Sequence, residues 1–521
     1  MNKTDDNIII EFKALNYYID KFKENNLSCK LIGGVNDLAK GQVLGLAYDS
    51  RSVKPGYVFF GLIGQNQDGN KYIDQAIING ASCVISEIPP NKQYDLPYLV
   101  VDNIRLVLAL FSHEFYGKPG DSLNLIGITG TNGKTTTTHL LENLVSNFGI
   151  IGTLGARFRQ SDIDNDNYQV LNFTTPFPPE LHQVLNIQRA NDIKTVAMEV
   201  SSHALSLDRV AYLDFNIACL TNITQDHLDF HKTMENYVNA KFKLFENLIN
   251  SPKKNKFAIL NKDSIYGHEF ESRLQTLNPH NHDVTILTYG FNQESSLFVK
   301  NYTNSFDSTT IHLNGILGEF SLTIPVIGVF NIYNVLATIL IAYALGIDKN
   351  LIIDQLKNFK GVPGRFERVS SGNEPLCIVD YAHTPDGLAN VLKASRELTP
   401  KSGKLIVVFG CGGDRDSSKR PQMGAIAEEL ADSIIITSDN PRSEDPEQII
   451  ADILSGIKKL KTIHVEKDRS CAIKLAISQA NANDVIVIAG KGHENYQIIG
   501  NETRFFDDRK EARENLRLKT S

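Results

Sequence analysis

The chain has 521 residues, of which 42% are hydrophobic and 22% charged, and its formal net charge is −7. This composition is that of a folded globular protein with about three domains, at roughly 150 residues each. The acidic balance excludes a global basic field of the kind that recruits nucleic acid or anionic membranes. We therefore expect small-molecule partners, no nucleic acid and no membrane, and we expect local pockets to bind any anionic substrate.

The cysteines and the start of the chain indicate the compartment. Six cysteines are scattered without any C-x-x-C pair, which argues against a zinc site or a disulfide framework and favours a reducing environment. The first residues, MNKTDDNIII, are unlike a signal peptide. The longest apolar run, VLATILIAYALGI, is too short to span a bilayer and indicates a buried helix. We expect a cytoplasmic monomer.

Residues 1–120 are expected to form a small α/β domain. YVFFGLI and YLVVD are typical of strands, YIDQAIINGA is typical of a helix, and the Gly/Pro stretch YGKPGD ends the unit. Residues 121–360 follow as a central domain. Its expected strands LNLIGIT, KTVAMEV, FNIACLTNI and KFAILN alternate with helical stretches, the pattern of a mostly parallel sheet covered by helices.

After the punctuation FKGVPGRFE, residues 361–521 are expected to form a Rossmann-like domain. The strands LCIVDY, KLIVVFG, SIIITSD and DVIVIAG alternate with the helices PQMGAIAEELA and EQIIADILSGIKKL. The predicted fold class is therefore α/β with three domains: a small N-terminal domain, a central P-loop ATPase-like domain with a mostly parallel sheet, and a C-terminal Rossmann-like domain. Ligands in such sheets bind beyond the carboxyl ends of the strands.

The stretch IGITGTNGKTTTTHLL nearly matches the phosphate-binding loop G-x-x-x-x-G-K-[ST], but Ile128 stands where the first glycine belongs. The buried strand LNLIGIT, the glycine loop and the helical pattern TTTTHLLENLVSNF nevertheless follow in the required order. The amides of Gly130 and Gly133 can close on phosphate oxygens, Lys134 adds a positive charge and Thr135 offers a hydroxyl to Mg²⁺. The alternative is a plain glycine turn beside a solvated lysine.

Three further residues could complete a metal site beside Thr135. They are Glu199 in MEVSSH, His227 in TNITQDHLDFH and Lys241 in NYVNAKFKLF. Mg²⁺ prefers hard oxygen ligands, so a carboxylate at the end of a strand is a chemically sensible partner for the threonine hydroxyl. Each residue taken alone also has an ordinary interpretation, as a solvated glutamate, a surface histidine and a lysine on a helix face.

Motifs that extend nearly end to end resemble one family. They are DSRSVKPGYVFFGLIG, GITGTNGKTTT, MEVSSHAL, TNITQDHLDFH, AKFKLF, GVFNIYN, GVPGRFE, DYAHTPD, FGCGGDRDSSKRP, SDNPRSEDP and AGKGHENYQ. In these segments the chain resembles the Mur ligases of peptidoglycan synthesis. The loop G-T-N-G-K-T is shared with folylpolyglutamate synthetase and indicates only the superfamily, whereas CGGDRD and GKGHE indicate the branch that adds diaminopimelate.

The resemblance implies an ATP-dependent ligase that joins meso-2,6-diaminopimelate to a UDP-muramoyl dipeptide and forms ADP and phosphate. The γ-phosphate of ATP moves to the side-chain carboxylate of D-glutamate, and the amine then attacks the acyl phosphate. The alternatives are the lysine-adding branch and, more remotely, folylpolyglutamate synthetase, which lacks DSRSV and DNPR. A nucleotide switch without ligase chemistry would leave the acidic-amine pocket without a use.

The implied catalytic residues are Lys134, Glu199, His227 and Lys241, and the implied Mg²⁺ ligands are Thr135, Glu199, His227 and Lys241. Lys241 is implied to carry a carbamate, as N6-carboxylysine, because an ammonium would repel the metal whereas a carbamate is an anion.

The resemblance also implies three sets of binding residues. Those for ATP are Gly130, Thr131, Asn132, Gly133, Lys134, Thr135, Thr136, Asn331 (with Asn334 as an alternative), Arg365, Asp380 and His383. Those for the UDP-sugar dipeptide are Ser50, Gln65, Asn66, Gln67, Thr174, Thr175, Ser201 and Arg209, where a plain polar turn is the alternative for 65–67. Those for diaminopimelate are Arg415, Asp439, Asn440, Pro441, Arg442, Gly490 and Glu494.

Arg442 in DNPR is the most informative of these residues. Diaminopimelate differs from lysine by one carboxylate, and a guanidinium binds a carboxylate through two parallel hydrogen bonds. An ordinary strand-to-helix turn explains Asp439 and Pro441 but not this arginine. The chain departs from its relatives at Phe173 and Leu207, which stand where those relatives carry polar Asn and Gln.

Overall fold

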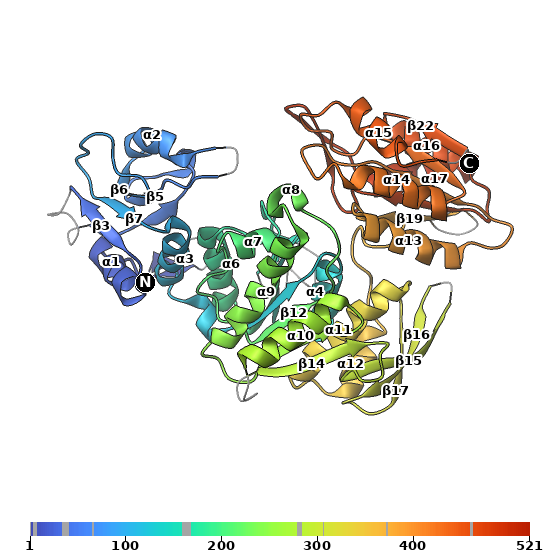
Figure 1. Ribbon diagram of the computed structural model, residues 1–521, viewed down its shortest axis with the longest axis horizontal. Coiled ribbons are helices and arrows are strands. Elements are labelled where there is room, and N and C mark those ends of the chain that lie inside the picture. The colour runs from blue at the N-terminus through green and yellow to red at the C-terminus, as the bar shows by residue number, and fades with distance from the viewer. Residues whose placement is uncertain are drawn as a thin grey trace.

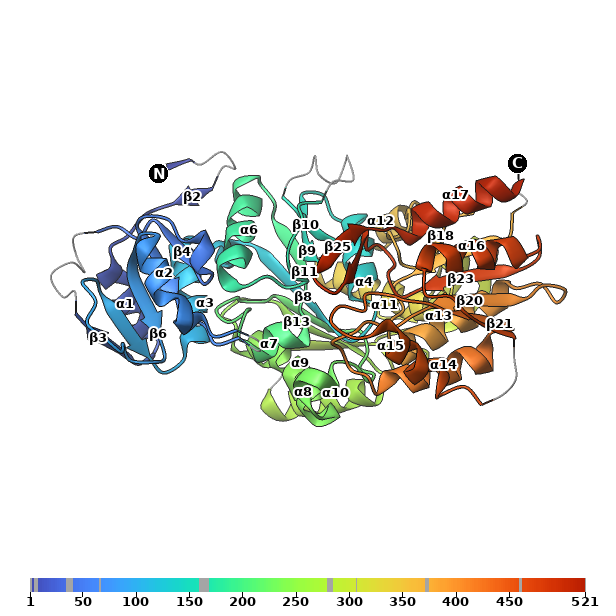
Figure 2. The same cartoon turned by 90° about the horizontal axis from the view of Figure 1, so that it is seen from above.

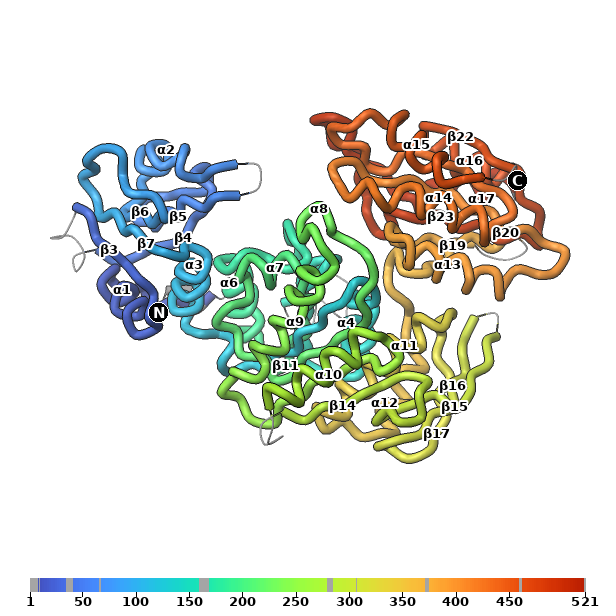
Figure 3. The backbone as a smooth tube through the Cα atoms, viewed as in Figure 1, coloured from blue at the N-terminus to red at the C-terminus, as the bar shows by residue number. Residues whose placement is uncertain are grey.

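The computed structural model describes residues 2–3, 8–33, 41–64, 67–158, 168–278, 284–305, 307–370, 374–458 and 462–520. Three large sheets, of five, ten and six strands, follow one another along the described chain, and helices cover each of them, so that three bodies are visible in Figures 1 and 2. The tube in Figure 3 passes through these bodies in chain order. The predicted α/β class is confirmed.

The first sheet has the strand order β3-β7-β6-β5-β4 and is parallel except where β3 meets β7. Its core lies between the sheet and two helices. In this core Tyr18 stacks on Phe111, with the ring centroids 3.9 Å apart. The elements of this unit are β1 (Asn2–Lys3), β2 (Ile9–Ile10), α1 (Leu15–Glu24), β3 (Cys29–Ile32), β4 (Gly45–Ala47), β5 (Tyr57–Phe60), α2 (Ile73–Ile78), β6 (Ala81–Ser86), β7 (Tyr98–Val101) and α3 (Ile104–Phe115).

The second sheet has ten strands, in the order β10-β9-β11-β8-β12-β13-β14-β15-β16-β17. Strands β9 to β15 in this order are parallel, and antiparallel strands lie at both edges. One cluster of buried apolar side chains lies under α4 and α11, and a second lies under α6, α7, α9 and α10, so helices cover both faces.

The strands of this central unit are β8 (Asn124–Thr129), β9 (Phe148–Gly152), β10 (Gly155–Arg157), β11 (Thr195–Glu199), β12 (Ile217–Leu220), β13 (Lys256–Asn261), β14 (Val284–Gly290), β15 (Leu297–Asn304), β16 (Thr309–Gly315) and β17 (Phe320–Ile324). Its helices are α4 (Lys134–Glu142), α6 (Pro178–Ala190), α7 (Ser202–Ser206), α8 (Leu228–His231), α9 (Met234–Asn250), α10 (Ile265–Leu277), α11 (Val329–Ala344) and α12 (Lys349–Leu356).

The third sheet has the order β18-β19-β23-β20-β21-β22 and is parallel apart from β18. Apolar clusters again lie on both of its faces. Its elements are β18 (Glu367–Arg368), β19 (Leu376–Asp380), α13 (Pro385–Leu398), β20 (Leu405–Phe409), α14 (Lys419–Leu430), β21 (Ser433–Ile436), α15 (Pro446–Leu454), β22 (Thr462–Val465), α16 (Arg469–Gln479), β23 (Val485–Ala489), the hairpin β24 (Tyr496–Ile499) and β25 (Glu502–Phe505), and α17 (Asp508–Thr520).

The sequence pattern predicted the length of one helix wrongly. The apolar spacing of TTTTHLLENLVSNF extends to Phe148, but α4 ends at Glu142. Asn147 has a φ of +50°, a left-handed conformation that breaks a helix, and Phe148 begins strand β9 with its ring fully buried. The apolar run 335–347 lies mostly in the buried helix α11, as predicted. We keep 1–120, 121–360 and 361–521 as the proposed domain limits.

Candidate active site

The glycine loop joins β8 to α4 at the carboxyl edge of the central sheet. Gly130 has a φ of +149°, and a Cβ atom there would lie 1.9 Å from Thr221 Oγ1, so only glycine fits. Thr221 Oγ1 donates to the carbonyl of Asn132 at 2.6 Å, and the Asn222 side chain accepts from the Asn132 amide at 2.9 Å. The loop after β12 therefore holds the glycine loop in place through hydrogen bonds.

Glu199 lies beside this loop because it pairs in register with Ile128 of the neighbouring strand. Its carboxylate is fully buried and accepts hydrogen bonds from the Thr135 hydroxyl at 3.1 Å and from the amide and hydroxyl of Thr153 at 2.9 and 3.0 Å. Among the described residues its recorded hydrogen-bond donors are neutral groups. A buried carboxylate with this arrangement is suited to bind a hard cation next to phosphate.

Two lysines converge on the carbonyl of Gly130. Lys134 Nζ donates to it at 2.9 Å and Lys241 Nζ donates at 2.8 Å. Lys241 is 1% exposed, and its Nζ lies 4.5 Å from the centroid of the Tyr237 ring. Burial, together with the charge of Lys134, lowers the pKa of Lys241 well below its usual value. This environment favours the neutral amine of Lys241, which is the form that can react with CO₂.

His227 begins α8 with a left-handed φ of +56° and faces the cavity. Its Nε2 lies 3.4 Å from Asp226 Oδ2, and its ring meets the His203 ring edge-on at 4.7 Å. Burial lowers the pKa of His227 to about 3 against the opposing charge of Asp226. A neutral imidazole in this place can bind a metal. The sequence analysis missed Asp226 and His203, although both lie in the motifs that it singled out.

Contacts between the central and C-terminal sheets form on the glycine loop. Arg365 Nη2 donates to the Thr135 hydroxyl at 3.1 Å, and Asn132 Nδ2 donates to Asp386 at 2.9 Å. Thr136, Asn331 and Arg365 line a cavity of about 620 Å³ beside α4. Three of the predicted nucleotide residues therefore surround one space next to the loop.

The remaining predicted nucleotide residues differ in their environment. Asn334 packs against Gly133, because a Cβ on that glycine would lie 2.3 Å from Asn334 Oδ1, whereas Asn331 lines the cavity. Both carboxylate oxygens of Asp380 accept backbone N–H groups, from Phe366 at 2.6 Å and Ala382 at 2.8 Å. This described carboxylate lines neither of the two cavities. It shapes the turn after β19 instead.

A cavity of about 1640 Å³ is lined by residues of all three units of the chain. Most of the residues predicted for the UDP-sugar dipeptide and for the amine line this one space. They are Ser50, Gln67, Thr174, Thr175, Ser201, Arg209, Arg415, Asp439, Asn440, Arg442, Gly490 and Glu494, together with His227 and His383. Pro441, also described, does not line it, and the predicted Gln65 and Asn66 lie outside the described residues.

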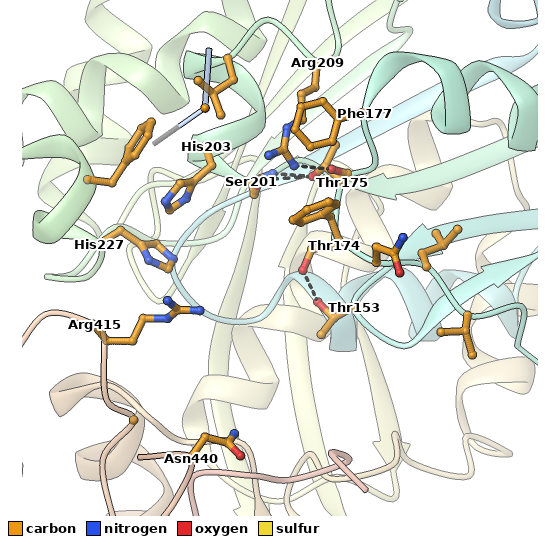
Figure 4. Close-up of a pocket in the computed structure, with 18 of the residues that line it drawn as sticks. Thr153, Thr174, Thr175, Phe177, Ser201, His203, Arg209, His227, Arg415 and Asn440 are labelled. Atoms are coloured by element: carbon orange, nitrogen blue, oxygen red, sulfur yellow. Dashed lines mark hydrogen bonds between the residues drawn. The ribbon is translucent and has the colours of Figure 1, made fainter. Parts of the chain in front are cut away.

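The central wall of this cavity is a hydrogen-bonded group of side chains (Figure 4). Thr175 Oγ1 accepts from the Ser201 amide at 3.0 Å, and Arg209 Nη1 donates to the Thr175 carbonyl at 2.9 Å. The hydroxyls of Thr174 and Thr153 lie 3.2 Å apart. Thr153 also donates to Glu199, which accepts from Thr135 at the start of α4. Hydrogen bonds therefore connect this wall to the helix that follows the glycine loop.

The N-terminal wall includes an arginine that the sequence analysis did not single out. Arg105, at the start of α3, donates to the Ile63 carbonyl at 2.7 Å and lines the large cavity. Ser50 begins a 3-10 turn whose Asp49 side chain accepts from the Arg51 amide. Asn103, the N-cap of α3, marks where this helix begins. Nothing in the local sequence indicated that this end of the helix lies at the cavity.

The C-terminal wall contains the predicted amine residues. Asn440 Nδ2 donates to Glu494 Oε2 at 2.9 Å, and the buried Lys491 donates to both side chains at 3.2 and 3.1 Å. Arg442 has a φ of +53°, and its Nη1 donates to the Gly413 carbonyl at 2.7 Å. Arg415 is exposed and extends toward His227 across the cavity in Figure 4. The sequence analysis missed Lys491.

The described residues were also compared with the patterns of metal-binding clusters and of membrane-spanning helices. Within the described residues, no group of three or more His, Cys, Asp and Glu side chains is arranged to hold a metal ion. The predicted ligand set differs from such a group, because it contains Thr135 and a modified Lys241. In the same part of the chain, none of the helices has the length and apolar character needed to cross a bilayer.

The glycine loop, the buried carboxylate and a cavity shared by three α/β units define a nucleotide-dependent enzyme that brings substrates together from separate units. Comparisons with known proteins give its family. The Mur ligase middle domain profile matches residues 128–342, the Mur ligase glutamate ligase domain profile matches residues 364–492, and the Mur ligase family catalytic domain profile matches residues 42–116.

Individual relatives agree with these profiles. A protein of Syntrophomonas wolfei named UDP-N-acetylmuramoyl-L-alanyl-D-glutamate--2,6-diaminopimelate ligase is 43% identical over 500 residues, covering 95% of this chain and 98% of the relative. A protein of the same name from Gloeobacter violaceus is 43% identical over 484 residues, covering 92% and 95%. A solved structure of a ligase of that name has a TM-score of 0.64 at 32% identity and covers 98% of this chain and 100% of its own.

The chain belongs to the Mur ligase family. It is accordingly an ATP-dependent amide ligase of peptidoglycan synthesis, and the resemblance stated from its motifs is confirmed.

Proposed function

We propose that the protein adds 2,6-diaminopimelate to UDP-N-acetylmuramoyl-L-alanyl-D-glutamate at the expense of ATP. One observation carries this proposal: a single cavity of about 1640 Å³ is lined by Thr175 and Arg209 on one side and by Arg415 and Arg442 on the other. An acyl substrate on the first side and an acidic amine on the second would meet in one space. The names of the relatives with near-complete coverage give independent support.

ATP is proposed to bind with its phosphates on the glycine loop and its base in the cavity of about 620 Å³ beside α4. The loop amides, Lys134 and the N-terminus of α4 would neutralise the phosphates. Arg365 reaches the same place, since it donates to the Thr135 hydroxyl at 3.1 Å. These groups position the γ-phosphate without forming a bond to it.

Mg²⁺ fits the donor groups beside the loop, because the buried Glu199 carboxylate has neutral hydrogen-bond donors and stands next to the Thr135 hydroxyl. We propose Thr135 and Glu199 as protein ligands of one Mg²⁺, and His227 with a carbamate on Lys241 as protein ligands of a second. When bound, Mg²⁺ would offset the negative charge of the phosphates and of the incoming carboxylate. The carbamate would form when the neutral Lys241 amine attacks CO₂ and releases one proton.

The proposed reaction has two covalent steps. The D-glutamate side-chain carboxylate attacks the γ-phosphorus, ADP leaves, and an acyl phosphate forms. The amine of diaminopimelate then attacks the acyl carbon, loses a proton, and expels phosphate from the tetrahedral intermediate. In this scheme the Thr174, Thr175 and Ser201 wall orients the acyl chain, and Arg209 binds an anionic group of the nucleotide-sugar.

Amine selection is proposed to depend on Arg442 and Arg415. A guanidinium recognises a carboxylate in a planar, two-pronged geometry, and lysine lacks the second carboxylate of diaminopimelate. Asn440 and Glu494, held by Lys491, are suited to the amino group beside that carboxylate. We place the reaction in the cytoplasm, where ATP is available, and propose that the enzyme acts as a monomer.

Phosphate release from purified protein tests the proposal. The assay contains ATP, Mg²⁺ and the UDP-muramoyl dipeptide, with diaminopimelate, lanthionine, lysine or ornithine as the amine. We expect turnover with diaminopimelate, reduced turnover with lanthionine, and at least about 30-fold lower kcat/KM with lysine and ornithine. Omission of either the dipeptide or the amine should abolish steady-state phosphate release. Equal use of lysine, or nucleotide hydrolysis that needs neither substrate, would refute the proposal.

A further inference from the structure

Phe173 is an exposed aromatic side chain in the wall of the large cavity. Its side chain is 45% exposed, and among the described residues it joins none of the apolar clusters that form the cores. Exposing a large ring has no benefit for folding, since burial is what makes such a residue stabilising. The position of Phe173 therefore needs a local explanation.

The local partner of Phe173 is the guanidinium of Arg209. The Arg209 Cζ atom lies 4.7 Å from the centroid of the Phe173 ring and 4.0 Å from that of the Phe177 ring. The two rings meet edge-on, with their centroids 5.3 Å apart. One guanidinium thus contacts two aromatic rings, which we call the Arg209 clamp. Figure 4 shows its Phe177 half against Arg209.

The far side of the clamp is fixed from the N-terminal unit. Tyr48 packs on Phe177 with ring centroids 4.7 Å apart, and its hydroxyl donates to Glu180 at 2.9 Å. Phe177 is thereby held between two units of the protein. Among the described residues, the recorded ring contacts of Phe173 are those with Arg209 and Phe177, and these contacts hold its ring.

Arg209 is a buried cation whose hydrogen bonds are incomplete. It is 7% exposed, donates from Nη1 to the Thr175 carbonyl at 2.9 Å, and forms no recorded ion pair with any described carboxylate. Its Nε atom is buried and has no hydrogen-bond partner among the described residues. Burial lowers the pKa of Arg209 to about 10, so it stays charged at pH 7. Among the described residues, the guanidinium is thus held by one hydrogen bond and two ring contacts, so the rings set its orientation.

We infer that Phe173 is a positioning residue that holds the Arg209 guanidinium, through ring contact, in the orientation that binds an anionic group of the nucleotide-sugar substrate. This inference rests on the proposed function for the identity of that substrate. The contact favours a flat aromatic ring, because a delocalised guanidinium interacts with the negative face of a ring and gains nothing comparable from an aliphatic side chain. Phe173 occupies a place where a direct polar contact was expected from the resemblance, and it contributes through Arg209 instead.

Calorimetric binding of UDP-muramoyl dipeptide, without ATP or amine, tests the inference. F173L should weaken binding about three- to tenfold, the range of a cation–π contact, whereas F173Y, which keeps the ring, should restore binding to within about twofold of wild type. In an R209A background, F173L should have no further effect. F505L is the matched control, because Phe505 is 67% exposed, lies 5.5 Å from Lys510 Nζ and does not line the cavity.

Two results would overturn the inference: equal losses for F173L and F173Y, or an undiminished effect of F173L in the R209A background. A measurement without substrate separates this from a failure of the proposed function. The side-chain Nε–H signal of Arg209, assigned by its loss in R209K, should show an upfield ring-current shift to which both rings contribute; F173L should reduce this shift and F173Y should keep it. If wild type fails to bind the nucleotide-sugar while this shift is present, the clamp stands and the substrate assignment falls.

Discussion

Arg442→Ala should remove the preference for diaminopimelate over lysine. The side chain is half-buried in the cavity wall and would be paired with a carboxylate that only diaminopimelate carries. Loss of one partner of a hydrogen-bonded charge pair costs about 2–5 kcal/mol, and half-burial selects the lower end. About 2 kcal/mol corresponds to roughly a 30-fold loss of kcat/KM for diaminopimelate.

The structure also defines what else the Arg442→Ala substitution changes. Arg442 Nη1 donates to the Gly413 carbonyl at 2.7 Å, so the variant loses about 1 kcal/mol of loop stabilisation as well. That loss affects every amine equally and cancels in the ratio of diaminopimelate to lysine. The φ of +53° strains alanine and arginine alike, so the backbone contributes nothing to the difference.

Steady-state phosphate release with each amine measures the ratio. Arg442→Lys keeps the charge but loses the planar pair, and should fall between wild type and the alanine variant. Arg396→Ala is the matched control, because this exposed arginine pairs with Asp432 at 2.8 Å outside the cavity. The reasoning fails if Arg442→Ala slows lysine and diaminopimelate equally, or if the KM for ATP changes as much as that for the amine.

Three other substitutions probe the loop and the acid stability of the fold. Lys241→Ala should abolish most turnover and regain part of it with added acetate, whereas Lys243→Ala on the same helix should stay active; full activity of the first variant would contradict a carbamate ligand. Gly130→Ala would place a methyl group 1.9 Å from Thr221 Oγ1, so the loop must shift, and ADP affinity measured by fluorescence should fall at least about tenfold. Burial lowers the pKa of His182, whose ring nitrogens have no partners among the described residues. Protonation of His182 is therefore disfavoured in the folded state. Its contribution to the free energy of unfolding is fully present above the unfolded pKa of about 6.5, and as the pH falls below that value it is lost by up to about 1.4 kcal/mol per pH unit. Between pH 7.5 and 5.5 the Tm of His182→Leu should fall less than that of wild type, and equal slopes would show that His182 does not carry the effect.

Local patterns in the sequence predicted most of the strands near the site. LNLIGIT, KFAILN and LCIVDY are continuous apolar runs, and the structure places β8, β13 and β19 in them, because strands buried on both faces need no polar alternation. Local sequence patterns did not predict the order of these strands in the sheet. Nothing in the residues of β11 indicates that it lies between β8 and β9, since pairing partners are chosen by packing across the whole sheet.

The candidate site shows the same division between local and distant information. Glycine and lysine in the loop carry their chemistry locally, so the motif predicted the strand, loop and helix that the structure contains. Asp226, Lys491 and Arg105 gain their importance from groups more than forty residues away, or from a cavity formed by several units. Asp226 and Lys491 lie within the motifs TNITQDHLDFH and AGKGHENYQ, but nothing local in those motifs indicated which distant groups they contact, and Arg105 lies in none of the quoted motifs.

The hydrogen bond between Arg365 and Thr135 joins the C-terminal unit to the helix that follows the glycine loop, and this contact would couple nucleotide binding to amine binding. Arg365 leads into the C-terminal sheet, and Thr135 opens the helix that follows the glycine loop, yet the two are joined at 3.1 Å. A ligand that changes the placement of one must act on the other, and such coupling is reciprocal for binding free energies. If bound nucleotide raises the affinity for the amine by some factor, bound amine raises the affinity for nucleotide by the same factor. The order in which substrates accumulate on the enzyme would then follow from their concentrations, while the coupling would depend on the hydrogen bonds that join the two units, Arg365 to Thr135 and Asn132 to Asp386 among them.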